Sequence, residues 1–255
     1  CMLHYDVLKD KNVLITGVTG GVGANIAKEL LNRGCNLFIT GRNRIKLKEI
    51  SSELSETLIV YGGGGSSIVK NTVYHRPCDL SNTSNVLSLI ADVREVFDNI
   101  DILVNSAGIF PVKDFVDLNL DDYNKCINVN LTAPFLLINE FVKEMIKNKW
   151  GRIINIASSS AYSGSPKTSI YCASKHALLG MSRSIYQEFK SDNVRVLTIS
   201  PGSIQTEMGR RVEELGQDYD TFINPEELAE YVVYISSFDK EMISEEVRLN
   251  RLIIR

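Results

Sequence analysis

The sequence predicts an α/β fold in which helices cover both faces of one doubly wound parallel sheet. Runs of strand length alternate along the chain with stretches that repeat apolar residues every three or four positions. The strand-length runs are almost continuously apolar, which is typical of strands buried on both faces of a parallel sheet. A glycine-rich turn follows the first of these runs, where folds of this class bind ligands.

Five apolar runs are predicted to be strands, and five periodic segments are predicted to be helices. The strands are residues 13–15, 37–39, 102–104, 153–156 and 194–199. The helices are residues 25–33, 45–54, 86–97, 133–147 and 170–189. Strands that alternate with helices build βαβ units, so we expect the strands to run parallel.

Three segments depart from this alternation. Residues 56–71, with Gly62–Gly65 at their centre, are predicted to be a surface loop insertion rather than a phosphate cradle, because no helical pattern follows directly. Residues 203–222 are irregular and follow the 194–199 strand, so we predict a lid over the ligand edge of the sheet. The alternating part of residues 246–255 is a candidate for the last strand at a sheet edge.

The composition predicts one globular domain over residues 1–255. Of its 255 residues, 44% are hydrophobic and 23% charged, as in ordinary folded proteins. The net charge of −3 provides no broad positive field, which argues against nucleic acid as a partner. The five cysteines include no CxxC pair, so we expect neither disulfides nor a metal site. Without a long apolar run or a leader pattern, we predict a cytoplasmic protein with no membrane partner.

The glycine-rich turn is a candidate site for the pyrophosphate of a dinucleotide. Glycines let the backbone approach a ligand closely, and the following helix offers unpaired N–H groups and a partial positive charge. Turns often contain glycine for structural reasons alone. The prediction therefore depends mainly on the position of this turn directly after the first strand. The residues expected to contact the cofactor here are Gly17, Thr19, Gly20, Gly21 and Val22.

The residues after the second strand favour NADP(H) over NAD(H). A carboxylate at this place would accept hydrogen bonds from the ribose of NAD, and none is present. Arg42 can instead pair with a 2′-phosphate, and Asn43 is next to it. The alternative is that Arg42 is a solvated residue at a helix start. Asp79 and Leu80, at the end of the expected third strand, border the adenine, or Asp79 caps the next helix.

Tyr171 and Lys175 are the candidate proton-handling pair. They are four residues apart in a helical segment, so both side chains project from the same face. An ammonium group beside the phenol, together with the charge of the nicotinamide, is expected to lower the pKa of the phenol, which would make Tyr171 a usable general acid or base. Alone, such a pair is more often structural. Ser158, after the predicted strand at 153–156, and residues 105–108, after the predicted strand at 102–104, are expected at the same crevice.

These motifs together resemble the short-chain dehydrogenase/reductase family over nearly the whole chain. The cofactor turn (Thr16-Gly17-xxx-Gly21-x-Gly23), the segment Asn105-Ser106-Ala107-Gly108 and the spacing of Ser158 and Tyr171 carry the resemblance. It implies a single Rossmann-type catalytic domain, with about seven strands in the order 3-2-1-4-5-6-7, and B-face hydride transfer. It implies a catalytic tetrad of Asn130, Ser158, Tyr171 and Lys175. It also implies cofactor contacts at Asn105, Ala107, Gly108, Tyr171, Lys175, Pro201, Gly202, Ile204 and Thr206.

Within that resemblance, Lys175 is expected to hold the nicotinamide ribose and Asn130 to support a water molecule in a proton relay. The helices at residues 133–147 and 170–189 are expected to form a four-helix contact, so a homodimer or homotetramer is predicted. The usual family ending, a glycine-containing stretch, is replaced by residues 247–255 (Val-Arg-Leu-Asn-Arg-Leu-Ile-Ile-Arg). This departure argues against the C-terminal subunit contact that many family members use to form tetramers.

The function predicted from the sequence is an NADP(H)-dependent oxidoreductase that moves a hydride between nicotinamide and a carbonyl or secondary alcohol. The alternatives are a sugar or cyclic alcohol dehydrogenase that uses NAD, a non-catalytic redox-sensing nucleotide-binding protein, and a subunit active only beside a partner. Substrates bound to a carrier protein are considered because Lys167, Arg210 and Arg211 could meet an acidic partner. The residues expected to face substrate are Phe110, Pro111, Ala161, Tyr162, Ser165 and Met208.

Overall fold

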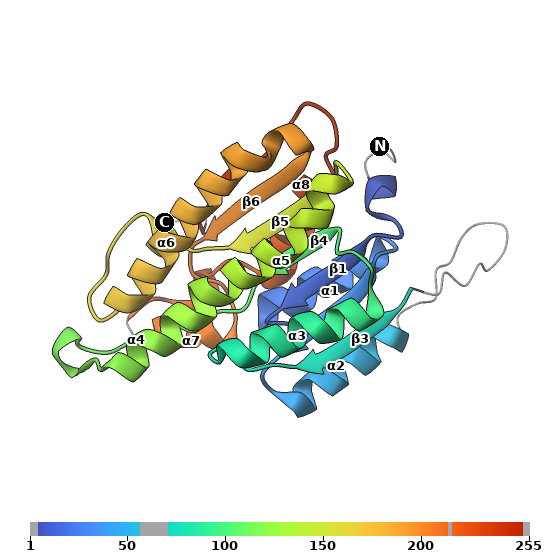
Figure 1. The fold of residues 1–255 in the computed structure, drawn as a ribbon. Coiled ribbons are helices and arrows are strands. Elements are labelled where there is room, and N and C mark those ends of the chain that lie inside the picture. Colours follow the sequence, from blue (N-terminus) through green and yellow to red (C-terminus); the bar gives the residue numbers. More distant parts are fainter. Residues whose placement is uncertain (1–4, 57–70, 214–215, 252–255) are drawn as a thin grey trace.

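The core of the protein is a parallel sheet. The computed structural model describes residues 5–56, 71–213 and 216–251, and within them seven strands pair in the order β3-β2-β1-β4-β5-β6-β7 (Figure 1). All neighbouring strands run parallel. The strands are β1 (Asn12–Thr16), β2 (Asn36–Gly41), β3 (Val73–Pro77), β4 (Ile102–Asn105), β5 (Gly151–Ile156), β6 (Val194–Pro201) and β7 (Glu246–Leu249). The predicted fold class and strand order are confirmed.

Helices cover both faces of this sheet, as Figure 1 shows. They are α1 (Gly21–Asn32), α2 (Arg44–Glu56), α3 (Thr83–Val96), α4 (Leu120–Ile127), α5 (Ala133–Lys147), α6 (Ser169–Phe189), α7 (Glu207–Glu213) and α8 (Pro225–Ser236). Successive strand residues face opposite sides. Val13 and Ile15 accordingly pack with α1, α2 and α8, whereas Leu14 packs with α3, α5 and α6. Each buried strand therefore carries apolar residues at nearly every position.

Two helices that the periodicity did not predict, α4 and α8, begin at recognisable caps. The side chain of Asn119 accepts a hydrogen bond from the N–H of Asp122, whose side chain accepts one from the Asn119 N–H in return. The Asn224 side chain accepts from two N–H groups of α8, and Pro225 occupies the first helical position. These caps were the sequence signal for both helices.

The segment 203–222 is less irregular than predicted. It contains the two-turn helix α7 and a short 3-10 helix, Tyr219–Thr221. Its two ends are joined, because the N–H of Gln205 donates to the Ile223 carbonyl at 2.9 Å and the N–H of Ile223 donates to the Ser203 carbonyl at 2.9 Å. The two ends of this segment are therefore held together by backbone hydrogen bonds.

The predicted strand near the C-terminus is confirmed by β7, which pairs with β6 from Glu246 to Leu249. The end of the tail, residues 252–255, and the glycine-rich stretch Gly62–Gly65 lie outside the described residues. The four cysteines that the structure describes are free thiols. Among the described helices, none is long and apolar enough to span a bilayer.

A buried arginine stabilises the sheet at the end opposite the candidate site. The side chain of Arg152, at the start of β5, is fully buried. It donates hydrogen bonds to the carbonyls of Ser236 and Phe238, at 3.2 and 3.0 Å, and to the Asp239 carboxylate at 2.6 Å. Its guanidinium also lies over the Trp150 ring. Arg152 therefore ties the end of α8 to the sheet.

Candidate active site

The carboxyl ends of the central strands bring the predicted site residues to one edge of the sheet. Thr16 of β1 is in register with Asn105 of β4, and Asn105 is in register with Asn155 of β5. The Asn105 side chain donates to the Asn155 side chain at 2.8 Å. The Thr16 hydroxyl accepts from the N–H of Ala107 at 3.2 Å. The glycine turn and the segment after β4 therefore lie side by side.

The glycine turn has the shape that a pyrophosphate requires. Gly17 has a φ of +77°, and a Cβ at this position would lie 2.6 Å from the Cα of Ala107. A Cβ on Gly21 would lie 2.8 Å from the Cγ2 of Thr206. Gly20 begins α1 with no side-chain cap, so no side chain blocks the first N–H groups of the helix. These residues fit the phosphates of a dinucleotide.

At the expected adenosine end, the structure places Arg42 and Asp79 near each other. Asp79 has a lowered pKa, first because it accepts the Ser81 N–H and to a smaller extent because Arg42 is positively charged. Asp79 follows β3 by two residues and does not cap α3; that role belongs to Asn82. Arg42 is exposed just after β2, where it can reach a phosphate. Leu80 is buried.

Asn43 has a structural role in addition to any contact with a cofactor. Its side-chain oxygen accepts hydrogen bonds from the N–H groups of Ile45 and Lys46, each at 3.1 Å. Asn43 therefore caps the start of α2. At the opposite side of the turn, a Cβ on Gly41 would lie 2.6 Å from the Thr19 Cγ2, which places Thr19 against the end of β2.

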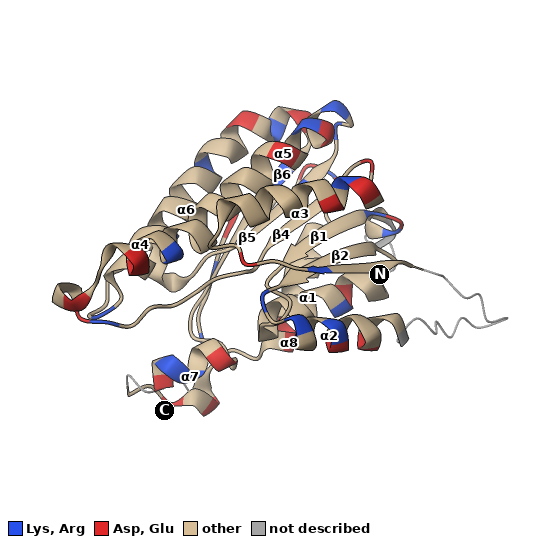
Figure 2. Cartoon of the chain, turned by 60° about the horizontal axis from the view of Figure 1, so that its bottom comes forward, with Lys and Arg blue, Asp and Glu red and all other residues tan. Residues whose placement is uncertain are grey.

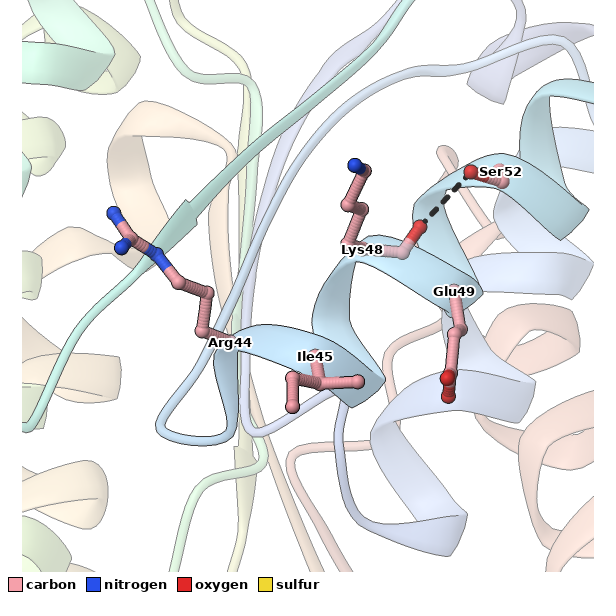
Figure 3. Close-up of a pocket in the computed structure, with 5 residues that line it drawn as sticks. All are labelled: Arg44, Ile45, Lys48, Glu49 and Ser52. Atoms are coloured by element: carbon pink, nitrogen blue, oxygen red, sulfur yellow. Dashed lines mark hydrogen bonds between the residues drawn. The ribbon is translucent and has the colours of Figure 1, made fainter.

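Figure 3 shows a hollow on α2, which begins at Arg44, directly after Asn43. Its lining residues are Arg44, Ile45, Lys48, Glu49 and Ser52. The dashed line marks the Ser52 hydroxyl donating to the Lys48 carbonyl at 3.0 Å, an ordinary bond within a helix. The lining contains none of the predicted site residues, so we assign it no function.

The candidate proton donor, Tyr171, is in the first turn of α6 and is only 8% exposed. Burial raises the pKa of the phenol to about 12, and the adjacent Ser158 hydroxyl opposes this increase. Ser158 comes just after β5, where its side chain also accepts the Ser160 N–H at 3.1 Å. The predicted proximity of Ser158 and Tyr171 is therefore present in the structure.

Lys175 is buried beside Tyr171, with its Nζ 5.7 Å from the centre of the phenol ring. The Nζ donates to the Ile156 carbonyl at 2.8 Å, and burial lowers the pKa of Lys175 to about 8. In the chain by itself the pKa of Tyr171 is thus raised, and the lowering expected from Lys175 together with the charge of a bound nicotinamide stays a prediction. Burial dominates, because it disfavours the charged forms of both groups.

Asn130 lies in the π-helical turn Asn128–Thr132, between α4 and α5. Its side chain accepts from the N–H of Ile109 at 2.9 Å and donates to the Ile109 carbonyl at 3.0 Å. A Cβ on Gly108 would lie 3.6 Å from the Asn130 oxygen and 3.8 Å from the Lys175 Nζ. Asn130 thus fixes the segment after β4 next to Lys175.

The sequence did not indicate Cys126 or Ser174 as part of this cluster. The Asn130 amide donates to the Ser174 hydroxyl at 3.0 Å and to the Cys126 sulfur at 3.4 Å. Both residues are buried. Cys126 precedes Asn130 by four residues, so helical spacing was the available signal for their contact.

The predicted cofactor contacts after β6 adjoin the glycine turn through Thr206, which lies against Gly21. Ile204 forms a parallel bridge with Ile223, and the N–H of Gly202 donates to the Leu249 carbonyl at 2.8 Å. Pro201, the last residue of β6, is buried. The segment that leaves β6 is therefore held between β7 and the start of α1.

The residues expected to face substrate have different surroundings. The Phe110 ring packs edge-on against the Tyr171 ring, with 4.7 Å between centroids. The Tyr162 hydroxyl instead donates to Glu246 of β7 at 2.7 Å. Ala161 is buried and Met208 is exposed. Pro111 is half-buried, and the Ser165 carbonyl accepts from Thr168. Among the described residues, Phe110 thus has the ring contact to Tyr171.

The three basic residues considered for a carrier protein all have partners within the chain. Lys167 pairs with Asp114 at 3.3 Å, and Arg210 pairs with Glu213 at 3.6 Å. Arg211 donates to the Phe110 carbonyl at 3.2 Å. They do not form a free basic patch. Figure 2 shows charges of both signs distributed over the helices.

Comparison with known proteins assigns the family. The family model described as short chain dehydrogenase matches residues 11–215. A 3-oxoacyl-[acyl-carrier-protein] reductase FabG of Rickettsia bellii is 31% identical over 244 residues, covering 93% of each chain. An uncharacterized oxidoreductase, YvrD of Bacillus subtilis, is 36% identical over 221 residues, covering 85% of this chain and 79% of YvrD.

Solved structures agree with this assignment. A metagenomic short-chain oxidoreductase crystallised in complex with NADP is 28% identical, with a TM-score of 0.79, over 97% of this chain and 100% of that chain. The match extends across the glycine turn and the edge where Tyr171 and Lys175 lie. The chain therefore belongs to the short-chain dehydrogenase/reductase family and is an oxidoreductase that acts on an alcohol/carbonyl pair with a nicotinamide cofactor.

Proposed function

We propose that the protein reduces a ketone with NADPH and that residues 1–255 act as one catalytic domain. The observation that supports this most strongly is the placement of Tyr171, Lys175 and Ser158 together at the edge that carries the glycine turn. A bound reduced nicotinamide would supply the hydride. The chain's own residues would orient the carbonyl and handle the proton. A non-catalytic sensor would have no chemical need for this combination.

In this proposal, Tyr171 donates the proton and Ser158 holds the carbonyl oxygen. With a pKa near 12, the phenol is protonated at neutral pH, which is the form that a reduction needs. The Ser158 hydroxyl, adjacent to the phenol, can donate to the same oxygen as negative charge develops. Lys175 would hold the cofactor ribose. Asn130 would keep Ile109 and Gly108 in place beside it and support the water of a proton relay.

The test is NADPH oxidation with two acceptors, a 3-oxoacyl thioester and a cyclic ketone. We favour the thioester because the relatives of known name are 3-oxoacyl-[acyl-carrier-protein] reductases. If a carrier protein presents it, Lys167, Arg210 and Arg211 would first have to leave their partners. Oxidation of a sugar or cyclic alcohol with NAD, without reduction of either ketone by NADPH, would support the alternative dehydrogenase.

Arg42 is proposed to select NADP(H). Replacing Arg42 with Asp should weaken NADPH binding about 10- to 100-fold, because a charge-assisted hydrogen bond is worth about 1.5–3 kcal/mol. NADH binding should not weaken, because the new carboxylate can accept hydrogen bonds from the ribose hydroxyls of NADH. Calorimetric titration measures both dissociation constants. Lys48→Asp, one helical turn beyond the start of α2, changes the net charge equally and serves as control. Equal losses of NADPH affinity in the two variants would indicate a general electrostatic effect of the changed net charge. That result would contradict a specific role for Arg42 in selecting NADP(H).

A homodimer is proposed on the basis of the α4 apolar patch. This patch consists of Phe115, Val116, Leu120, Tyr123 and Phe135, which are 47–89% exposed. An apolar patch of this kind is typical of an interface. It lies at the α4 end of α5 and α6 in Figure 1, the two helices expected to form the subunit contact.

The dimer is tested by replacing Leu120 with Glu and measuring mass by light scattering. A buried charge at the interface should leave the variant monomeric at concentrations where the wild type is dimeric. Leu87→Glu, which changes an exposed leucine of α3 away from the patch, should leave the mass unchanged. A dimeric Leu120→Glu variant would show that the interface lies elsewhere.

A further inference from the structure

The helix α7 is joined to the opposite wall of the site by one arginine. Arg211 donates from its Nη1 to the carbonyl oxygen of Phe110 at 3.2 Å. This bond connects the loop after β6 to the segment after β4, which are 101 residues apart in the sequence. A guanidinium holds a carbonyl more strongly than a neutral donor would. The backbone at Phe110 is therefore fixed from the α7 side.

The Phe110 side chain covers the candidate proton donor. Its ring meets the Tyr171 ring edge-on, with an interplanar angle of 78° and a centroid separation of 4.7 Å. Phe110 is 7% exposed and Tyr171 is 8% exposed. One side of the phenol is thus occupied by an aromatic ring, and a substrate must fit the space that remains.

The position of α7 is itself well defined. Gly209 packs so tightly that a Cβ would collide with the Ile204 carbonyl oxygen and would lie 3.5 Å from the Phe222 ring. The N–H of Gly209 also donates to the Thr206 hydroxyl at 3.1 Å. Arg210, next in the chain, lies instead over the Tyr219 ring at 4.4 Å. Of these two neighbouring arginines, Arg211 is therefore the one that reaches Phe110.

We propose that Phe110 is the specificity-determining side chain of the acceptor site and that Arg211 is the residue that positions it. This inference rests on the proposed function. Because the Phe110 ring stands against the phenol that must reach the substrate oxygen, the accepted carbonyl should have a small, unbranched substituent on the side facing Phe110. The Arg211 bond opposes outward movement of this wall, because that movement would break a charge-assisted hydrogen bond.

The test compares two esters that differ only at the ketone, ethyl acetoacetate with a methyl group and ethyl benzoylacetate with a phenyl group. The variants are Phe110→Ala, Arg211→Met and the matched control Arg210→Met. Phe110→Ala should raise the ratio of kcat/KM for the phenyl ketone over the methyl ketone by at least about tenfold. Arg211→Met should raise it by about threefold or more, whereas Arg210→Met should leave it within about twofold.

Unchanged ratios in Phe110→Ala would overturn the specificity role, and an Arg211→Met ratio equal to that of Arg210→Met would overturn the positioning role. Hydrogen exchange of the full chain provides a second readout that does not depend on turnover. Arg211→Met should speed amide exchange at Ile109, Phe110 and Val112 by about tenfold relative to Arg210→Met. Equal exchange in the two variants contradicts the Arg211 contact. A wild-type chain that reduces neither ester overturns the specificity role together with the proposed reductase function. In that case the hydrogen-exchange result still tests the contact between Arg211 and Phe110.

Discussion

Replacing Tyr171 with Phe is expected to lower kcat for ketone reduction by about 10²- to 10⁴-fold, the usual contribution of a positioned general acid. The substitution removes only the hydroxyl, so the ring contact with Phe110 is retained. The dissociation constant for NADPH should stay nearly the same, because the glycine turn and Arg42 are unaffected. Steady-state kinetics and fluorescence titration of NADPH measure the two quantities.

Tyr162→Phe is the matched control for this experiment. Tyr162 is on the same segment after β5 as Ser158, but its hydroxyl donates to Glu246 and Arg248 lies over its ring. We expect kcat within about tenfold of the wild type, because no chemical step is assigned to this hydroxyl. A Tyr171→Phe variant that reduces ketones at nearly the wild-type rate would contradict the role given to Tyr171.

Replacing Arg152 with Met is expected to lower the free energy of unfolding by about 2–4 kcal/mol, because two backbone carbonyls and the Asp239 carboxylate, which is 32% exposed, lose one shared donor. Arg152 is fully buried and remains charged at neutral pH, although burial lowers its pKa to about 10. Its loss would leave the Ser236 and Phe238 carbonyls without this donor. Urea unfolding followed by circular dichroism measures the change.

Arg183→Met provides the comparison for that stability measurement. Arg183 binds Glu246 through two hydrogen bonds, but its side chain is 59% exposed. Exposed ion pairs contribute about 0–1 kcal/mol, so this loss should be small. If Arg152→Met destabilised the protein no more than Arg183→Met does, the buried cluster at the start of β5 would not be the stabilising contact described above.

The sequence predicted the central strands better than the edges of the sheet. Nearly all residues of β1, β4 and β5 are buried, and each of these strands contains a run of two or three consecutive apolar residues. The edge strand β3 has exposed residues at its three central positions, and β7 has three partly buried residues and one exposed residue. The apolar signal of both edge strands is therefore weak. The apolar periodicity did not predict helices α4 and α8, although the capping residues Asn119 and Asn224 mark where they begin.

The candidate site could be predicted to the extent that its residues occur in local motifs. The glycine turn, Ser158 and the Tyr171–Lys175 pair were found in this way, and the structure brings them to one edge. Contacts between distant segments were not predictable. The bond from Arg211 to Phe110 depends on how α7 packs, and the direction of the Tyr171 pKa depends on complete burial of the phenol.

The most direct test of a carbonyl reductase built on Tyr171, Lys175 and Ser158 is product analysis with NADPH deuterated at the B-face position of C4. Mass spectrometry of the reaction with a 3-oxoacyl thioester should show one deuterium on the carbinol carbon of the product. The Tyr171→Phe variant should give almost no labelled alcohol over the same period. An unlabelled alcohol would contradict transfer from the B face, and consumption of NADPH without formation of alcohol would contradict reduction at this site.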